Sequence, residues 1–77
     1  MSIREEKKLL TALSKRVKEL RNKKGVTQEQ AYNDTGIHFG RIEQGRRDAS
    51  FLTLNKICEY FEINLEEFFK DGFKSSK

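Results

Sequence analysis

The sequence contains no proline, no tryptophan, one cysteine and one histidine among its 77 residues. Without proline, and with only five glycines, the chain favours helices joined by short turns over strands or linkers. The single cysteine, Cys58, excludes an intramolecular disulfide. Its place within an apolar helical pattern predicts a small buried core residue. One cysteine and one histidine are too few for a structural zinc site, so we expect no bound metal.

Motifs for catalysis, cofactor binding and membrane insertion are also missing. There is no glycine-rich phosphate loop, and His38 has no orienting carboxylate beside it, as a catalytic triad requires. Glu66 and Glu67 point to different sides of a helix, so they do not form an acid–base pair. No apolar run approaches the roughly 20 residues that span a membrane, and the N-terminus lacks the apolar segment of a signal peptide. We therefore expect a non-enzymatic, cytoplasmic protein with no cofactor, no small-molecule ligand and no membrane association.

The length and the charge distribution narrow the choice further. The chain is long enough for one domain, which we expect to span 1–77, with a core over 9–70 and a polar tail at 74–77. Residues 1–50 carry a net charge of +5, and residues 51–77 carry −1. A basic front half suggests one face for a polyanion. On charge alone, a lysine-rich solvated surface is the alternative.

Apolar residues at spacings of three and four predict a compact all-α domain of five helices. The first helix is extended at its N-terminus, and its apolar face carries Leu10, Leu13, Val17 and Leu20. Its opposite face includes Lys15, Arg16 and Lys18, which we expect to be solvated, with one phosphate contact among them as the alternative. The five helices are expected over 4–24, 27–35, 37–44, 51–62 and the segment between Asn64 and Gly72.

Helix ends are marked by capping residues and glycines. A hydroxyl or amide side chain followed three residues later by Glu or Gln is typical of a capping box. This pattern occurs at Ser2 with Glu5, Thr27 with Gln30, and Asn64 with Glu67, and Ser50 is expected to cap the fourth helix. Glycines are expected to end helices or make turns at Gly25, Gly36 and Gly45, because only glycine enters the left-handed conformation without strain. We expect Phe39 in the core and Phe51 in the apolar stripe of the fourth helix.

The stretch Thr27–Gly45 contains two short helices and a glycine turn, which together form a helix-turn-helix motif. In that motif the second helix enters the major groove of DNA. The segments LSKRVKELRNKKGVTQEQ, RIEQGRRDAS and LTLNKICEYFEINLEEFF resemble the Cro/C1-type (XRE) helix-turn-helix family. The resemblance covers about residues 13–69. It implies a compact five-helix, lambda-repressor-like DNA-binding domain and a transcriptional regulator of bacterial or phage type.

The resemblance also implies roles for individual residues. Arg21 and Glu43 match the family's buried ion pair, which locks the recognition helix to the first helix. The implied DNA contacts are Thr27, Gln28, Arg46 and Arg47 with phosphates, and Arg41 with a base edge. From the residues themselves we also expect His38 to contact a base or a phosphate and Gln44 to share in the readout. Free N–H groups at a helix N-terminus attract phosphate, and arginine bonds guanine through two atoms.

Other roles for these residues remain open. His38 is alternatively a cover for the helix N-terminus, and Arg41 a partner of Glu29 or Asp34. Arg46 and Arg47 are alternatively solvated loop charges.

The sequence departs from the family pattern within this motif. Between Thr27 and Glu43 it is about three residues shorter than usual, and the missing residues lie at the N-terminal turn of the recognition helix. That turn normally carries the main base readers. The residues that remain there, Ile37 to Gly40, include two apolar side chains and one glycine. We therefore expect a lower sequence specificity, or a recognition helix that is shifted in the groove.

Two functions follow from this reading. The first is a sequence-specific regulator that binds operator DNA as a homodimer, and the second is a protein-binding module on the same fold, antitoxin-like or for assembly. Operators of this family are usually two-fold. One helix cannot bury both Phe68 and Phe69 in one small core, so these rings and Phe73 are candidates for the dimer interface. The apolar residues near the N-terminus, among them Ile3, are a second candidate. An N-terminal extension that covers Phe73 within one chain is the alternative to both.

Overall fold

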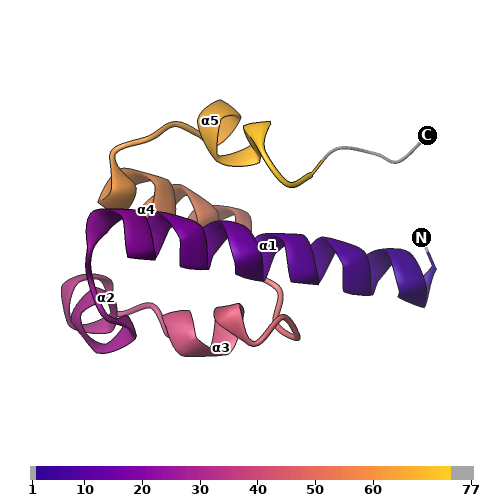
Figure 1. Cartoon of the computed structure of the whole chain (residues 1–77), viewed down its shortest axis with the longest axis horizontal. Coiled ribbons are helices and arrows are strands. Elements are labelled where there is room, and N and C mark those ends of the chain that lie inside the picture. The colour runs from indigo at the N-terminus through magenta and orange to yellow at the C-terminus, as the bar shows by residue number, and fades with distance from the viewer. Residues whose placement is uncertain (1, 74–77) are drawn as a thin grey trace.

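The structure is a computed structural model that describes residues 2–73. Within this part the chain forms five helices and no strand, as predicted (Figure 1). The predicted tail at 74–77 lies outside the described residues. The helices are α1 (Ile3–Lys24), α2 (Gln28–Thr35), α3 (Phe39–Glu43), α4 (Phe51–Phe61) and α5 (Leu65–Lys70).

The long first helix begins and ends at the predicted signals. The hydroxyl of Ser2 accepts a hydrogen bond from the N–H of Glu5, and the Glu5 carboxylate accepts one from the N–H of Ser2, so the capping box is present. Gly25 ends the helix with a positive φ of 80° and donates to the carbonyls of Arg21 and Asn22. No helix among residues 2–73 combines the length and the apolar character needed to cross a membrane.

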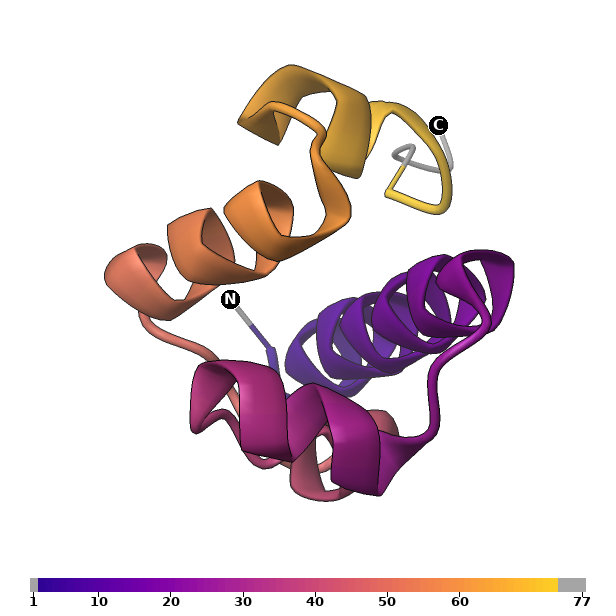
Figure 2. The ribbon, with the colours of Figure 1, turned by 90° about the vertical axis from the view of Figure 1, so that its left-hand side faces the viewer.

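The core lies where α1 passes between the other helices. Figure 2, viewed roughly along α1, places α2 and α3 below α1 and α4, with α5 above. Val17, Phe39 and Ile57 come from three different helices and are fully buried. The remaining buried apolar residues are Leu13, Leu20, Ala31, Ile42, Cys58 and Phe68. Phe39 and Cys58 are therefore core residues, as predicted.

The third helix is shorter than predicted. It begins at Phe39 rather than at Ile37. The N–H of Ile37 donates to the Thr35 hydroxyl at 3.0 Å, and His38 has a non-helical ψ of 81°. This hydroxyl, which also donates to the Ala31 carbonyl at 2.7 Å, holds the chain in a turn. α3 therefore has only five residues.

Two further predictions about side chains are wrong. Phe51 does not join the core, because it is the first residue of α4 and its side chain is 67% exposed. Arg16 is not part of a solvated face, since its side chain is only 11% exposed. Its guanidinium donates at 2.7 Å to two carbonyls of α5, those of Glu67 and Phe68. Arg16 thereby anchors α5 to α1 and satisfies carbonyls that the end of a short helix leaves free.

The three phenylalanines near the C-terminus have different environments. Phe68 is fully buried, so it is a core residue rather than a surface for a partner. Phe73 packs against the core, with its ring 6.0 Å from that of Phe68 and 5.0 Å from that of Phe69. Phe69 is 42% exposed. Of the three rings, only Phe69 presents much of its surface to solvent.

Candidate nucleic-acid interface

The helix-turn-helix begins with a well-capped second helix. The hydroxyl of Thr27 accepts from the N–H of Gln30, and the Gln30 side chain accepts from the N–H of Thr27. Within the described residues, the N–H groups of Gln28 and Glu29 have no acceptor, as is usual for the first turn of a helix. Gly36 then ends α2 at a φ of 76° and turns the chain into α3. The cap thus leaves two backbone donors at one exposed end of the motif.

The recognition helix α3 has a single free side chain. Phe39 and Ile42 are buried, so they hold α3 in the core rather than contact a ligand. Gly40 lies beneath the Gln28 side chain, where an added Cβ would come within 3.1 Å of the Gln28 amide oxygen. A side chain at this position would require the Gln28 amide to shift by a few tenths of an ångström. Arg41 is the one α3 residue whose side chain is left exposed and without a role in packing.

A buried ion pair fixes the orientation of α3. The Arg21 guanidinium donates to both carboxylate oxygens of Glu43, at 2.7 and 2.9 Å, and their side chains are 11% and 4% exposed. Arg21 also donates to the Val26 carbonyl at 2.8 Å. The Glu43 carboxylate accepts a third bond from the Gln28 amide at 3.1 Å. The hydrogen bond to Glu43 raises the pKa of Arg21. α1, the start of α2 and the end of α3 are therefore tied together at one carboxylate.

His38 precedes the recognition helix and stacks on α2. Its ring centroid lies 4.6 Å from that of Tyr32, with 27° between the planes. His38 occupies the cap position of α3, but its side chain makes no capping hydrogen bond. Tyr32 is 42% exposed, so the two rings form an aromatic platform at the surface beside α3.

Arg41 forms neither of the two internal pairs considered for it. Asp34 instead accepts a hydrogen bond from the Tyr60 hydroxyl at 2.7 Å, which ties α2 to α4. Among residues 2–73, the two ion pairs are Arg16–Glu19 and Arg21–Glu43. The Arg41 guanidinium is therefore available to an external acceptor.

The two arginines of the loop after α3 face different surroundings. Arg47 lines a shallow cavity of about 320 Å³ together with His38, Arg41 and Lys56. Arg46 instead lines a cavity with Leu9, Leu10 and Asp48, beside the N-terminal half of α1. The structure thus brings His38, Arg41 and Arg47 together and separates Arg46 from them.

The sequence reading missed Lys56 at this surface. Lys56 is the only Lys or Arg residue of α4, and the fold brings it to the cavity that His38 and Arg41 also line. Its isolated position in an otherwise uncharged part of the helix is the one signal that pointed to it.

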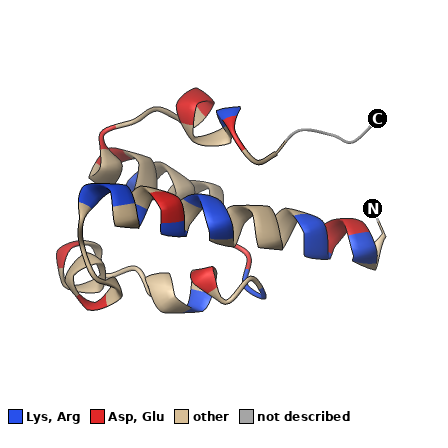
Figure 3. Ribbon diagram, in the orientation of Figure 1, with Lys and Arg blue, Asp and Glu red and all other residues tan. Residues whose placement is uncertain are grey.

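The charge of the motif itself is unusual for a surface that meets a polyanion. Residues 27–45 contain one arginine and three acids, Glu29, Asp34 and Glu43. Glu43 is neutralised by Arg21, but the other two acids lie on α2 (Figure 3). The positive charge is supplied from outside α2, by Arg41, Arg47 and Lys56.

Comparison with known proteins identifies the fold family. A family model described as a helix-turn-helix domain matches residues 14–71, which is more than half of the chain. No curated protein and no solved structure matches the sequence. The match includes α2, the glycine turn, α3 and the Arg21–Glu43 pair. The chain therefore belongs to the helix-turn-helix domain family of the Cro/C1 (XRE) type, a family of DNA-binding, non-enzymatic domains.

Proposed function

We propose that this chain is a sequence-specific transcriptional regulator that acts in the cytoplasm, at the nucleoid, and binds operator DNA as a homodimer. The observation that carries the proposal is the buried Arg21–Glu43 pair, because it orients a recognition helix whose one free side chain is a cation. Because the pair already fixes α3 against α1, binding to DNA carries no cost of ordering this helix.

In the proposed complex α3 lies in the major groove and Arg41 reads a base edge. An arginine bonds the O6 and N7 atoms of guanine in a bidentate manner, which is worth about 1–3 kcal/mol of discrimination against other bases. His38 and Gln44 flank Arg41 on either side of α3 and supply the remaining polar groups. With three readers per copy, the proposed half-site is short.

Phosphate contacts are proposed on both sides of the recognition helix. The free N–H groups of Gln28 and Glu29 form one donor set at the positive end of the α2 dipole, and Thr27 contributes its hydroxyl. Arg47 and Lys56 form the second set, since both line the cavity next to Arg41. The side chain of Gln28 is committed to Glu43, so its proposed contribution is its backbone N–H. Arg46 faces α1 and is proposed as a contributor to the long-range positive field rather than to a phosphate bond.

The test begins with selection of bound sequences from a random DNA pool, followed by affinity measurements on single-base variants of the selected site. Arg41→Ala should reduce affinity by about 1–3 kcal/mol and remove the preference at one base pair. Arg47→Ala should weaken all sequences alike, because a phosphate contact carries no sequence information. Lys70→Ala is the control, because Lys70 is an exposed cation on α5, on the other side of α1 from the helix-turn-helix. A pool that yields no motif would contradict sequence-specific binding.

A protein-binding module remains the second candidate. The acidic balance of residues 27–45 and the five-residue α3 favour it, because both weaken contact with DNA. This function predicts no measurable DNA affinity even at low salt, whereas the regulator predicts an affinity that rises steeply as salt is removed.

A further inference from the structure

One face of α2 runs along the recognition helix. Gln28 and Tyr32 are four residues apart, so they lie on the same face of α2, one turn from each other. The Gln28 side chain lies over Gly40 and donates to Glu43 at 3.1 Å. The Tyr32 ring lies against that of His38, with the centroids 4.6 Å apart and 27° between the planes. This face of α2 therefore contacts α3 at its middle and its end, and also contacts the residue that precedes it.

The stack with Tyr32 is the interaction that orients the His38 side chain. His38 has a ψ of 81°, outside the helical range, and its side chain makes no capping hydrogen bond. His38 is also exposed, so burial does not restrict its rotamer. Tyr32 belongs to a helix that is capped at both ends, so its ring is attached to a fixed backbone. Stacking of two rings is attractive beyond the area that it buries, and it holds the imidazole in one orientation.

His38 lies where the recognition helix lacks a base reader. The N-terminal residues of a recognition helix are the ones that contact base edges. In α3, Phe39 and Ile42 are buried, and Gly40 has no side chain. His38 and Arg41 line the same cavity of about 320 Å³. His38 is therefore the nearest exposed polar side chain on the N-terminal side of Arg41.

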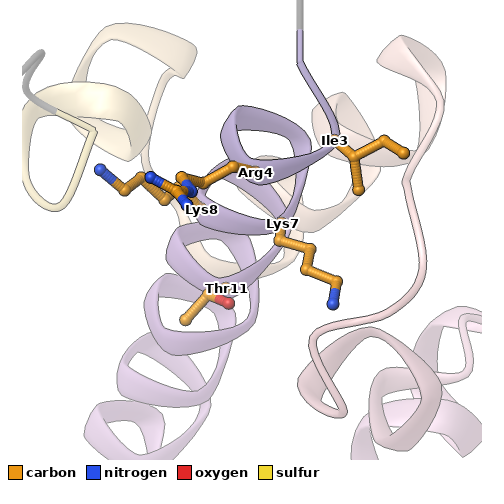
Figure 4. A pocket seen from close by; sticks show the side chains of 5 residues that line it. All are labelled: Ile3, Arg4, Lys7, Lys8 and Thr11. Atoms are coloured by element: carbon orange, nitrogen blue, oxygen red, sulfur yellow. The ribbon is translucent and has the colours of Figure 1, made fainter.

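The cavity at His38 differs from the cationic surface at the start of α1. All five residues that line the latter belong to α1. In Figure 4 Ile3 and Lys7 project to one flank of α1, whereas Arg4 and Lys8 project to the other. The cations there diverge, and no second helix lines the surface. The cavity at His38 is instead lined by residues of α3, α4 and the connecting loops, so its polar groups converge on one place.

We propose that Tyr32 is a positioning residue for DNA readout, which stacks on His38 and holds the imidazole towards the base pair beside the one that Arg41 reads. α2 thereby gives the support that the shortened N-terminal turn of the recognition helix lacks. A neutral imidazole has one N–H donor, and purines present the N7 acceptor in the major groove. The proposed contact is a hydrogen bond to this N7 atom, which selects a purine on one strand. This inference rests on the proposed function and adds the residue that orients its second reader.

A double-mutant cycle tests the coupling between the two rings. The affinities of the wild type, Tyr32→Ala, His38→Ala and the double variant are measured for the selected site and its single-base variants. Tyr32→Ala should reduce the purine preference at one base pair by about two- to tenfold, and His38→Ala should remove it. The double variant should lose no more than His38→Ala alone, because Tyr32 acts through His38. Tyr32→Phe keeps the ring and should retain the preference, as should Asn33→Ala, which changes an exposed neighbour on α2.

A purely structural role for Tyr32 predicts a different result. Destabilisation lowers the fraction of folded protein and weakens binding to all sequences alike, and urea unfolding of each variant measures that fraction. The inference is overturned if Tyr32→Ala leaves the purine preference unchanged, or if Tyr32→Phe loses as much of it as Tyr32→Ala. Additive losses in the double variant would overturn it as well.

The same measurements separate this inference from the function on which it rests. A wild-type protein that selects no motif overturns the proposed function and this inference together. A selected motif whose preferences survive both Tyr32→Ala and His38→Ala, but change in Arg41→Ala, overturns the inference alone and leaves the proposed function standing.

Discussion

Replacement of Arg21 by alanine should destabilise the whole domain. The Arg21 guanidinium makes three hydrogen bonds, two to Glu43 and one to the Val26 carbonyl. The Glu43 side chain is only 4% exposed, so Arg21→Ala leaves a desolvated carboxylate with the Gln28 amide as its remaining partner. Removal of one partner of a buried pair costs about 3–5 kcal/mol.

This loss is large relative to the stability of so small a chain. At roughly 0.05–0.15 kcal/mol per residue, a domain of this length has about 4–12 kcal/mol in total. We therefore expect Arg21→Ala to be partly unfolded at 25 °C, or to melt more than about 12 °C below the wild type, since 1 kcal/mol corresponds to about 4–8 °C in domains of this size. Urea unfolding followed by far-ultraviolet circular dichroism measures the difference, because the described fold is helical.

Two comparison variants separate this mechanism from a general loss of charge. Arg41→Ala removes an exposed arginine from the same motif and should change the free energy of unfolding by less than about 0.5 kcal/mol. Arg21→Met/Glu43→Leu removes both charges together and should recover most of the stability, because the desolvation cost disappears with the pair. If Arg21→Ala lost less than about 1 kcal/mol, the pair would behave like a surface ion pair and the proposed orientation of α3 would lose its physical basis.

Three further experiments test other contacts of the fold. Arg16→Ala should lower the free energy of unfolding by about 1.5–3 kcal/mol. Because Arg16 donates to two α5 carbonyls, the substitution should also speed amide hydrogen exchange in α5 more than in α4. Equal effects on both helices would contradict this role. Burial and the bond to Asp34 raise the pKa of Tyr60 to about 12, above the ordinary value of about 10. The contribution of Tyr60 to the free energy of unfolding is therefore complete below pH 10 and is lost as the pH rises towards 12. Tyr60→Phe should remove this pH dependence of the free energy of unfolding. Cys58 is only 2% exposed, and its burial raises the pKa of its thiol. Alkylation of this thiol should therefore proceed only as fast as the protein unfolds. Rapid labelling of the folded protein would contradict its place in the core.

The parts of the fold that depend on neighbouring residues could be predicted from the sequence. The capping boxes at Ser2, Thr27 and Asn64 form within three residues of each cap, and each is present. Gly25 and Gly36 adopt the left-handed conformation that ends a helix. These interactions form between residues that are close in the sequence, so a pattern of residue types is enough to specify them.

Features that depend on the three-dimensional arrangement of the helices could not be predicted from local sequence patterns. The hydroxyl of Thr35 takes the N–H of Ile37 and delays the start of α3, and no helical pattern reveals that competition. The sequence pattern predicts Arg16 to be a surface cation, whereas the fold places two α5 carbonyls within hydrogen-bond distance of its guanidinium. Similarly, Lys56 joins the surface around Arg41 only because α4 folds back beside α3.

The salt dependence of DNA affinity tests the central claim most directly. In the proposed complex Arg47 and Lys56 of each copy neutralise phosphates, so the logarithm of the affinity for the selected DNA should fall linearly with the logarithm of salt concentration. At about −0.9 per neutralised phosphate, a dimer with four such contacts has a slope of about −3.6. Arg47→Ala/Lys56→Ala should remove most of this slope and leave the smaller part that Arg41 and Arg46 contribute. A wild-type protein with no measurable affinity at low salt, or with a slope near zero, would contradict the account.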